Sequence, residues 1–529
     1  MQADGSSSQD IAAEAQRRRT IAVISHPDAG KSTLTEALAL HAQVIGEAGA
    51  VHGKGNRSGV VSDWLEMERK RGISITSAAL QFAWGDLTIN LLDTPGHADF
   101  SEDTYRVLTA VDCAVMLIDS AKGLEPQTFK LFEVCKRRNV PVIAFINKWD
   151  RPGREALELI DEITERLDRE PQLVTWPVGI GGSAFGLLDA ATGDVHAYRK
   201  APGGAQLAED ETLDPEAAAQ HFGEDDSRAR EESGLLPVLD SSAPKATVMP
   251  ILFGAALSNI GVRQLFETID RWAPAPGDRP TQSGDDRPVA EAFSGFVFKM
   301  QAGMDPKHRD HVAYVRVCSG VFERGMILTH QPTKRAFATK YALSIFGRDR
   351  EVTDRAYPGD VVGLVNAANL AVGDTLYDPE GPAVEFPPMP AFEPEHFASA
   401  RVADPSASKK FRRGMDKLVQ EGVVQRLISD LRGDGNPILA AVGPLQFEVA
   451  ADRMEHEFGA RLILDTLPYS LARKTDEAGA AEISGMHGVE IARRHDGTRL
   501  ALLRDIYLAR SIGRTHPDVT LTPLLADAT

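Results

Sequence analysis

From Thr20 to Thr33 the chain reads TIAVISHPDAGKST, an apolar run followed by a Gly-Lys turn and then a helical pattern. The turn fits G-x-x-x-x-G-K-[ST], with Ser25 in place of the usual first glycine. Backbone N–H groups and a helix N-terminus surround phosphates in such turns. We predict a phosphate loop in which Lys31 reaches the β- and γ-phosphates and the Ser32 hydroxyl binds Mg²⁺. A plain glycine-containing strand–helix turn is the alternative.

Four further apolar runs resemble the first, and helical patterns separate them. They are Leu87–Thr94, Cys113–Ser120, Pro141–Lys148 and Val248–Leu257. Near-continuous apolar strands that alternate with helices are typical of a parallel sheet buried on both faces. We therefore predict an α/β domain with a mostly parallel sheet.

The second apolar run ends in DTPGH, from Asp93 to His97. A carboxylate at a strand end suits a contact to Mg²⁺. The Gly96 N–H could meet a γ-phosphate, and His97 would then orient an attacking water. In isolation this segment is only a turn, but about 60 residues after a phosphate loop it indicates a nucleotide switch.

The fourth run ends in NKWD, from Asn147 to Asp150. The Asp150 carboxylate can accept both N1–H and N2–H of guanine, whereas adenine offers no matching donors. Asn147 and Lys148 can brace the purine and the phosphate loop. FGAAL at the end of the fifth run could offer a backbone N–H to the guanine O6. A helix-capping Asn/Asp pair is the alternative for this tetrapeptide alone.

A charged segment, SDWLEMERKRGISITSAA, lies between the phosphate loop and DTPGH. The hydroxyl of Ser74 or Thr76 could complete a Mg²⁺ shell when a γ-phosphate is bound. An exposed amphipathic loop is the alternative.

Taken in order, SHPDAGKS, RGISIT, DTPGH, NKWD and GAAL resemble the motifs of the translational GTPases, the elongation-factor class. The segments at residues 62–76, 93–123 and 295–320 more closely resemble the bacterial peptide chain release factor 3 family. The resemblance continues through AYPGD and GPLQFEV. It implies a P-loop GTPase domain with a mostly parallel sheet, then a β-barrel, then an α+β C-terminal domain.

The resemblance also implies which residues form the site. His97 and Lys31 are the expected catalytic residues, and ribosomal RNA would position His97. Mg²⁺ would lie on Ser32, Asp93 and one of the hydroxyls of Ser74 and Thr76; which hydroxyl stays open, because elongation factors usually carry Thr where Ser74 stands. GTP or GDP would contact Ser25, His26, Pro27, Asp28, Ala29, Gly30, Lys31, Ser32, Thr33, Asp93, Thr94, Pro95, Gly96, His97, Asn147, Lys148, Trp149, Asp150, Gly254, Ala255 and Ala256.

Composition shifts divide the chain into domains. We assign residues 16–280 to the GTPase domain, with an acidic insertion near 201–242, residues 289–385 to the β-barrel and residues 390–529 to the C-terminal domain. Residues 1–15 are expected to form a disordered tail.

Two local expectations accompany this division. Asp10 can cap a short helix from Ile11 to Arg19. The spacing in MDKLVQEGVVQRLI predicts a helix in the C-terminal domain.

Charge and cysteine content limit the class of protein. The 529 residues carry a formal net charge of −18 and three cysteines. This composition disfavours a disulfide framework, a structural zinc site and a nonspecific nucleic-acid coat. No apolar run is long enough for a membrane helix and no signal peptide is recognisable. We therefore expect a cytoplasmic protein that binds neither DNA nor membranes. We also expect it to be a monomer.

The resemblance implies a GTP-driven switch that binds the ribosome, both RNA and proteins. It would accelerate the dissociation of class I peptide release factors after peptide release. Two net-positive stretches, 299–350 and 401–432, suit docking onto RNA phosphates. Hydrolysis by the isolated protein should be slow, because the motifs contain no evident arginine finger.

Other functions remain as alternatives. Elongation factor G would continue for two further domains, and a tetracycline-resistance-type protection factor would also be longer. A class I release factor would carry GGQ, which the sequence lacks. A metabolic P-loop enzyme would not explain NKWD, and a structural protein would explain none of the motifs. The sequence leaves open the relative affinity for GTP and GDP, the class I factor that is displaced and the role of the insertion.

Overall fold

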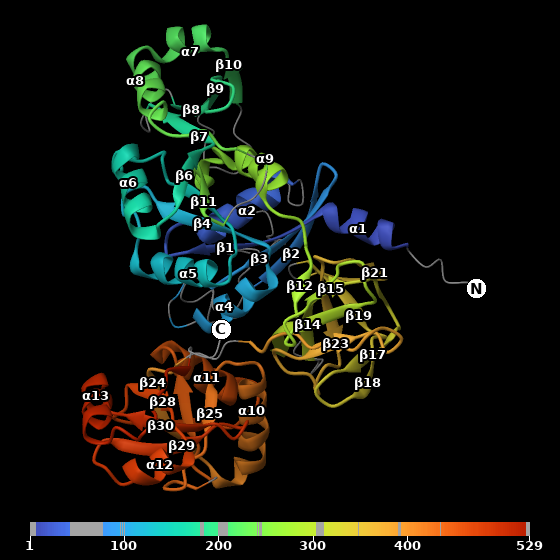
Figure 1. Ribbon diagram of the computed structural model, residues 1–529, viewed down its shortest axis with the longest axis vertical. Coiled ribbons are helices and arrows are strands. Elements are labelled where there is room, and N and C mark those ends of the chain that lie inside the picture. Colours follow the sequence, from blue (N-terminus) through green and yellow to red (C-terminus); the bar gives the residue numbers. More distant parts are fainter. Residues whose placement is uncertain are drawn as a thin grey trace.

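The computed structural model contains an α/β domain, a β-barrel and a C-terminal α+β domain, which lie side by side (Figure 1). Ser74, Thr76 and Gly96 lie outside the described residues. The structure describes residues 7–42, 78–95, 97, 99, 101–179, 185–198, 210–240, 242, 246–302, 311–346, 349–389, 393–433 and 435–524.

A seven-stranded sheet forms the centre of the α/β domain, in the order β2-β3-β1-β4-β5-β11-β6. The strands from β3 to β6 in this order pair in parallel, and β2 pairs antiparallel with β3. All five predicted strands are present; β2 and β6 were not predicted. The bounds are β1 (Arg18–Ser25), β2 (Ala78–Trp84), β3 (Leu87–Asp93), β4 (Cys113–Asp119), β5 (Val142–Asn147), β6 (Glu170–Leu173) and β11 (Val248–Phe253).

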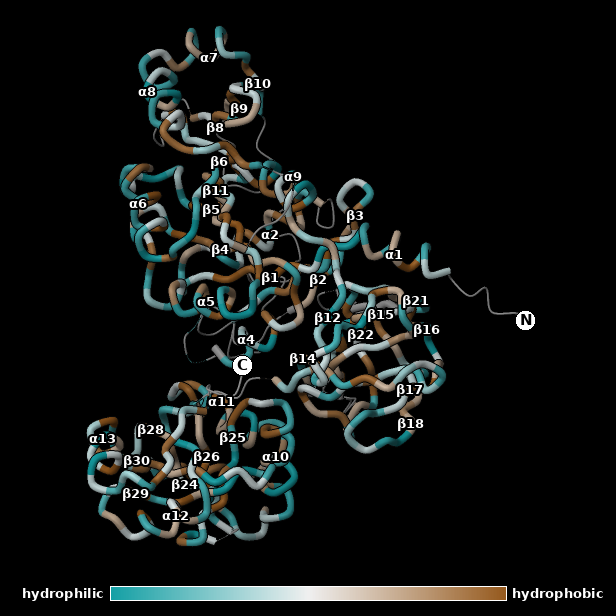
Figure 2. Tube along the Cα trace, viewed as in Figure 1, coloured by the Kyte–Doolittle hydropathy of each residue, from teal (hydrophilic) through white to brown (hydrophobic). Residues whose placement is uncertain are grey.

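Helices cover both faces of this sheet, because alternate strand residues point to opposite sides. In β1, Ile21 and Val23 belong to one apolar core and Ala22 and Ile24 to the other. Figure 2 shows the hydrophobic residues along these central strands. On one side lie α4 (Ser101–Ala110), α5 (Pro126–Arg137) and α6 (Ala156–Leu167), and on the other α2 (Lys31–His41) and α9 (Val262–Trp272).

The insertion begins earlier than its acidic composition indicated. A four-stranded antiparallel sheet starts at Thr175, so residues 201–242 cover only its later part. Its first strands carry buried apolar residues such as Trp176 and Leu187, which do not stand out by composition. The elements are β7 (Thr175–Val178), β8 (Phe185–Asp189), β9 (Val195–Tyr198), β10 (Asp210–Leu213), α7 (Pro215–Phe222) and α8 (Glu224–Ser233).

The second domain is an antiparallel β-barrel with the strand order β18-β17-β23-β14-β15-β22-β19-β20. Its apolar interior includes Val297, Val315 and Leu364. A strand pair in the linker, β12 (Arg279–Pro280) with β13 (Asp286–Arg287), precedes it. The remaining bounds are β14 (Ser294–Ala302), β15 (His311–Ser319), β16 (Phe322–Glu323), β17 (Ile327–His330), β18 (Arg335–Ala338), β19 (Ala342–Phe346), β20 (Asp349–Val352), β21 (Arg355–Ala356), β22 (Val361–Val365) and β23 (Thr375–Tyr377).

The C-terminal domain has two antiparallel sheets, β25-β26-β24-β27 and β28-β30-β29. The helix predicted at residues 415–428 ends at Gln420, because Gly422 turns the chain with φ +74° and residues 425–427 pair as a strand. The bounds are β24 (His396–Val402), α10 (Ser408–Gln420), β25 (Gln425–Leu427), β26 (Ile438–Ala441), α11 (Pro444–His456), β27 (Leu462–Thr466), β28 (Leu471–Lys474), α12 (Glu477–Ile483), β29 (Val489–Arg493), β30 (Arg499–Leu503) and α13 (Ile506–Thr515).

The described part of the N-terminal segment, from Ser7, forms a helix. Helix α1 (Ser8–Gln16) is capped by Ser7, not Asp10, and the Asp10 carboxylate accepts the Ser7 N–H at 3.0 Å in return. The disordered tail predicted for residues 1–15 is therefore wrong for residues 8–15. Tertiary packing overrides the polar composition, since Ile11 and Ala15 are buried in a cluster with Val289. Among the described helices, none has the length and apolarity to cross a membrane.

Candidate functional site

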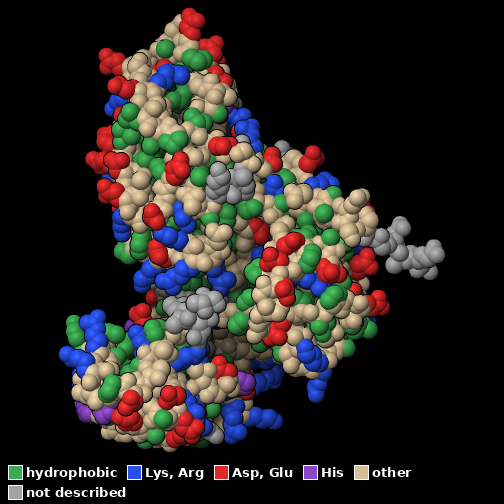
Figure 3. Space-filling view, viewed as in Figure 1, with side chains coloured by type: hydrophobic (Ala, Val, Ile, Leu, Met, Phe, Trp, Pro, Cys, Tyr) green, Lys and Arg blue, Asp and Glu red, His purple; other side chains and the backbone are tan. Residues whose placement is uncertain are grey.

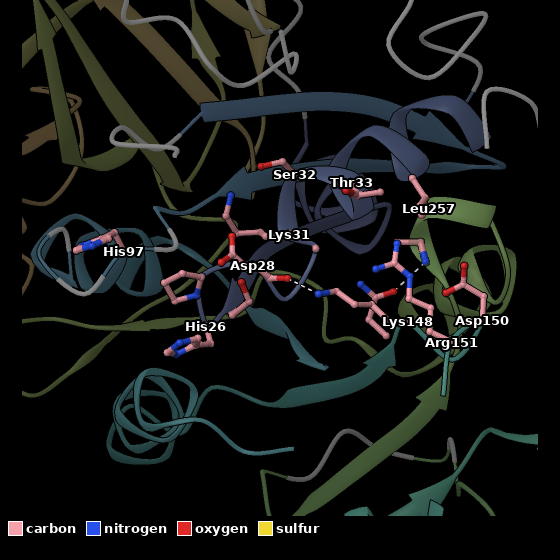
Figure 4. A pocket seen from close by; sticks show the side chains of 15 residues that line it. His26, Asp28, Lys31, Ser32, Thr33, His97, Lys148, Asp150, Arg151 and Leu257 are labelled. Atoms are coloured by element: carbon pink, nitrogen blue, oxygen red, sulfur yellow. Dashed lines mark hydrogen bonds between the residues drawn. The ribbon is translucent and has the colours of Figure 1, made fainter. Parts of the chain in front are cut away.

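The turn between β1 and α2 forms the wall of a cavity of about 360 Å³ (Figure 4). Gly30 caps α2 with φ 100°, a conformation that strains any residue with a Cβ. A Cβ at Gly30 would also overlap the Asn147 side chain. The lining residues are Ser25, His26, Pro27, Asp28, Gly30, Lys31, Ser32, Thr33, His97, Asn147, Lys148, Asp150, Arg151, Ala256 and Leu257.

Asn147, at the end of β5, holds two loops together. Its Nδ2 donates to the carbonyl oxygen of Ala29 at 2.8 Å, and its Oδ1 accepts the Ala256 N–H at 2.9 Å. The side chain is 2% exposed. The phosphate-loop turn and the turn after β11 are thus joined through one amide.

Lys148 ties the phosphate-loop turn to a third strand. Its ammonium donates to the Asp28 carbonyl oxygen at 2.5 Å and to the Asp119 carboxylate at 2.8 Å. Burial alone would raise the pKa of Asp119, but hydrogen bonds from Lys148 and the Ala121 N–H outweigh it and hold this pKa below its usual value. Asp119 was not predicted from the sequence. It could have been recognised as a carboxylate at the end of an apolar strand, since β4 ends there and Asp119 pairs with Asn147 of the NKWD motif.

Asp150 lies at the far end of the cavity from His97 (Figure 4). Its Oδ2 accepts a hydrogen bond from Ser258 Oγ at 3.1 Å. Leu257, 50% exposed, lies beside it on the short 3₁₀ turn η3 (Ala256–Ser258) and offers an apolar surface to a planar ring. Arg151 and Leu257 also line the cavity but were not predicted from the sequence. Neither residue stands at a motif position to which a contact with nucleotide is assigned.

Trp149 differs from its neighbours in the NKWD motif. Its ring is 6% exposed and packs edge-on against Phe253, with ring centroids 5.0 Å apart. The side chain is absent from the cavity lining in the described structure, so the contact of Trp149 with nucleotide stays a prediction that its ring position does not support. Its backbone N–H donates to the Gly254 carbonyl oxygen at 3.1 Å and so holds the turn after β11.

The end of β3 brings DTPGH to the phosphate loop. Lys31 forms a buried ion pair with Asp93, and the Thr94 hydroxyl donates to the Val23 carbonyl oxygen at 2.6 Å. His97 lines the cavity with its side chain 34% exposed. The two expected catalytic residues, Lys31 and His97, therefore border the same space.

The described residues fit a Mg²⁺ ion that is shared with phosphates. The Ser32 hydroxyl lines the cavity, and the Asp93 carboxylate lies at the adjoining strand end, both hard oxygen ligands. The described chain holds no cluster of three or more His, Cys, Asp or Glu side chains able to bind a metal unaided. This arrangement suits Mg²⁺, which usually takes one or two protein ligands together with substrate phosphates.

The phosphate loop, the NKWD loop with its Asp150 carboxylate and the β-barrel that follows are the features of a translational GTPase. The profile of the Elongation factor Tu GTP binding domain matches residues 16–275, and that of Elongation factor G domain 2 matches residues 292–379. The profile of the Class II release factor RF3, C-terminal domain, matches residues 386–512.

Similar proteins support this class. Peptide chain release factor 3 of Synechococcus elongatus is 44% identical over 97% of this chain and 94% of its own. That of Acaryochloris marina is 42% identical over 98% of each. A solved structure from Thermus thermophilus shares the fold, with a TM-score of 0.68 and 21% identity over 90% of this chain and 73% of that one.

The chain belongs to the peptide chain release factor 3 family, as its sequence motifs indicated. It is a translational GTPase that acts in the termination of protein synthesis.

Proposed function

We propose that this GTPase is stimulated by the ribosome and promotes the dissociation of class I release factors after peptide release. One observation carries the proposal: the phosphate loop, His97 and Asp150 border one cavity in a chain whose C-terminal domain matches the class II release factor profile. A termination switch needs both a nucleotide site and that domain. Because ribosomes work in the cytoplasm, we propose that location, with the protein acting as a monomer.

Nucleotide would lie along the cavity with its base at Asp150 and its phosphates at residues 25–33. The Asp150 carboxylate accepts the two N–H groups of guanine, and Leu257 covers the ring. The loop N–H groups, the α2 N-terminus and the Lys31 ammonium stabilise the phosphate charge. Lys31 must turn from Asp93 toward the phosphates, which makes its ion pair a switchable contact.

Mg²⁺ would be held by the Ser32 hydroxyl and supported by Asp93, with Ser74 or Thr76 as a further oxygen donor outside the described residues. When bound, the ion neutralises charge that develops on the β- and γ-phosphates. His97 orients the attacking water at the phosphate end of the cavity. Its own position sets the rate, since the chemistry depends mainly on positioning and charge.

Ribosome docking would use the basic side of the C-terminal domain. Lys409, Lys410, Arg412 and Arg413 are exposed on α10, whereas acidic side chains gather on the α7–α8 insertion (Figure 3). Exposed cations bind RNA phosphates by releasing counterions. The acidic insertion would therefore face away from RNA.

Replacing His97 by alanine tests the proposed function. We expect ribosomes to stimulate GTP hydrolysis by the wild type strongly and His97→Ala to lose at least about a hundredfold of this rate, because the water loses its orienting group. Binding of a fluorescent GTP analogue should stay within about twofold. Steady-state hydrolysis with and without ribosomes measures both.

His456→Ala is the matched control, because this exposed histidine of α11 lies outside the cavity. A second assay follows the release of a labelled class I factor from terminated ribosomes. Equal hydrolysis with and without ribosomes would reject the proposal. Stimulated hydrolysis without accelerated factor release would instead favour an elongation factor G-like role.

A further inference from the structure

Asp99, two residues after His97, contacts both the catalytic histidine and the C-terminal domain. His97 Nδ1 lies 3.2 Å from the Asp99 backbone nitrogen, which donates to it, and 3.2 Å from Asp99 Oδ1. The other carboxylate oxygen, Oδ2, accepts the backbone N–H of Leu445 at 2.7 Å. Asp99 is 9% exposed. One buried carboxylate therefore joins two domains.

The partner of Asp99 is the first turn of α11, a helix of 13 residues. Its N-cap position holds Gly443, which has no side chain to accept a first-turn N–H, although Ser, Thr, Asp or Asn usually does so. The Asp99 carboxylate does this from the other domain. A negative charge at a helix N-terminus is also favoured by the helix dipole.

The fit around this contact leaves no room for a larger residue. A Cβ at Gly443 would overlap the Asp99 carboxylate, although the backbone there is extended, with φ −144° and ψ 161°, and accepts any residue. A second contact supports the same docking: Arg106 of α4 reaches the Glu421 carbonyl oxygen at 3.5 Å, and a Cβ at Gly422 would overlap the Arg106 guanidinium.

We propose that Asp99 is a positioning residue through which docking of the α11 N-terminus holds His97 in its working place. The proposal rests on the proposed function, because it concerns the rate at which His97 acts. If α11 shifts, the Asp99 carboxylate loses its partner, and the Asp99 backbone N–H that donates to His97 Nδ1 loses its support. The C-terminal domain thereby sets the activity of a site whose described lining comes entirely from the α/β domain.

The test is the substitution Gly443→Ala in the C-terminal domain, because the added Cβ would displace the Asp99 carboxylate. We expect the maximal ribosome-stimulated rate of GTP hydrolysis to fall about tenfold. The affinity for a fluorescent GTP analogue and the ribosome concentration at half-maximal rate should stay unchanged. Gly513→Ala on α13, where a Cβ meets open space, is the matched control and should match the wild type.

A double-mutant cycle separates coupling from general damage. Asp99→Ala should lose a similar factor, and Gly443→Ala added to it should lose nothing more, since the group it displaces is gone. Asp99→Asn, which keeps an oxygen acceptor for Leu445, should retain most of the rate. Additive losses, or a Gly443→Ala rate equal to or above that of the wild type, would overturn the proposal.

Loss of stability in Gly443→Ala and failure of the proposed function can each be told apart from failure of this inference. If Gly443→Ala lowers the thermal midpoint too far for assay, the comparison of Asp99→Ala with Asp99→Asn decides, and equal rates for these two variants reject the inference. A wild type that ribosomes fail to stimulate would contradict the proposed function itself.

Discussion

Single residues at strand ends determine the chemistry of this site. Asn147 joins the phosphate loop to the turn after β11, and Lys148 joins the same loop to Asp119. Asp150 is left at the edge of the cavity, where its carboxylate can recognise a base. Within one short motif, Asn147 and Lys148 thus brace the loops, and Asp150 remains available to bind a ligand in the cavity.

At the residue scale, Asp150→Asn should change base preference. Replacing one carboxylate oxygen by an amide NH₂ puts a donor opposite the N–H groups of guanine, so GTP affinity should fall by about a hundredfold or more. Xanthosine triphosphate, with a carbonyl at that edge, should bind better than to the wild type. Competition against a fluorescent nucleotide measures both.

Arg151→Ala is the control, because Arg151 also lines the cavity and should leave the preference for guanine intact. Unchanged GTP affinity in Asp150→Asn would contradict the assignment of Asp150 to the base.

Element packing explains how α2 is held behind the phosphate loop. His41 in its last turn is half-buried, and its Nε2 has no hydrogen-bond partner among the described residues. Burial lowers the pKa of His41 to about 4, against a weaker opposing effect of a hydrogen bond with the Asn259 backbone. At neutral pH the last turn of α2 therefore packs with an uncharged His41 imidazole.

At the element scale, this burial predicts acid sensitivity. Above about pH 6.5 His41 is neutral in both the folded and the unfolded chain, so it costs no stability. Between pH 6.5 and 4 the unfolded chain gains a proton that the folded chain excludes, so stability falls, by up to about 3 kcal/mol. The urea midpoint as a function of pH measures the loss, which His41→Gln should reduce.

His456→Gln, at an exposed position, provides the comparison and should leave the pH profile of the wild type unaltered. A His41→Gln profile that is also superimposable on the wild type would show that His41 is not buried as described.

Across the whole molecule, a buried polar network joins the α/β domain to the barrel. Arg316 of β15, 1% exposed, donates to Asp112 Oδ2 at 2.6 Å and to the Gly359 carbonyl oxygen at 2.7 Å, and it contacts Thr20. Beside it, Arg18 of β1 donates to Asp360 at 2.8 Å. Charged side chains this deeply buried must be paired, so the network fixes the relative position of the two domains.

At this scale, Arg316→Ala should destabilise the joined domains by about 3–5 kcal/mol, because it leaves a buried carboxylate with a poorer partner. Among the described residues, Asp112 would then keep the longer ion pair with Arg279, at 3.4 Å. Chemical unfolding should show a lower midpoint, with the barrel and the α/β domain separating into distinct transitions.

Arg324→Ala removes an exposed arginine that pairs with Asp354 and should cost less than about 1 kcal/mol. A similar loss in the two variants would contradict a special role for the buried network.

The five strands and the loops at their ends could be predicted because their signals are local. Apolar runs identify buried strands, and SHPDAGKST, DTPGH and NKWD carry their chemistry in consecutive residues. The ordered start of the chain at Ser8–Gln16 and the early start of the insertion at Thr175 were not predicted. Only some residues of these two segments are apolar. Both segments are folded because those residues pack against distant parts of the chain.

The sequence by itself determined the class of protein, the order of its domains and many of the residues that line the cavity, because each depends on residues close together in the chain. The tertiary structure alone decided that Trp149 faces Phe253, that Arg316 joins two domains, and that Asp99 meets Leu445 across 346 residues. The physical reason is that burial and hydrogen-bond pairing between distant segments are properties of the folded chain, which no local pattern encodes.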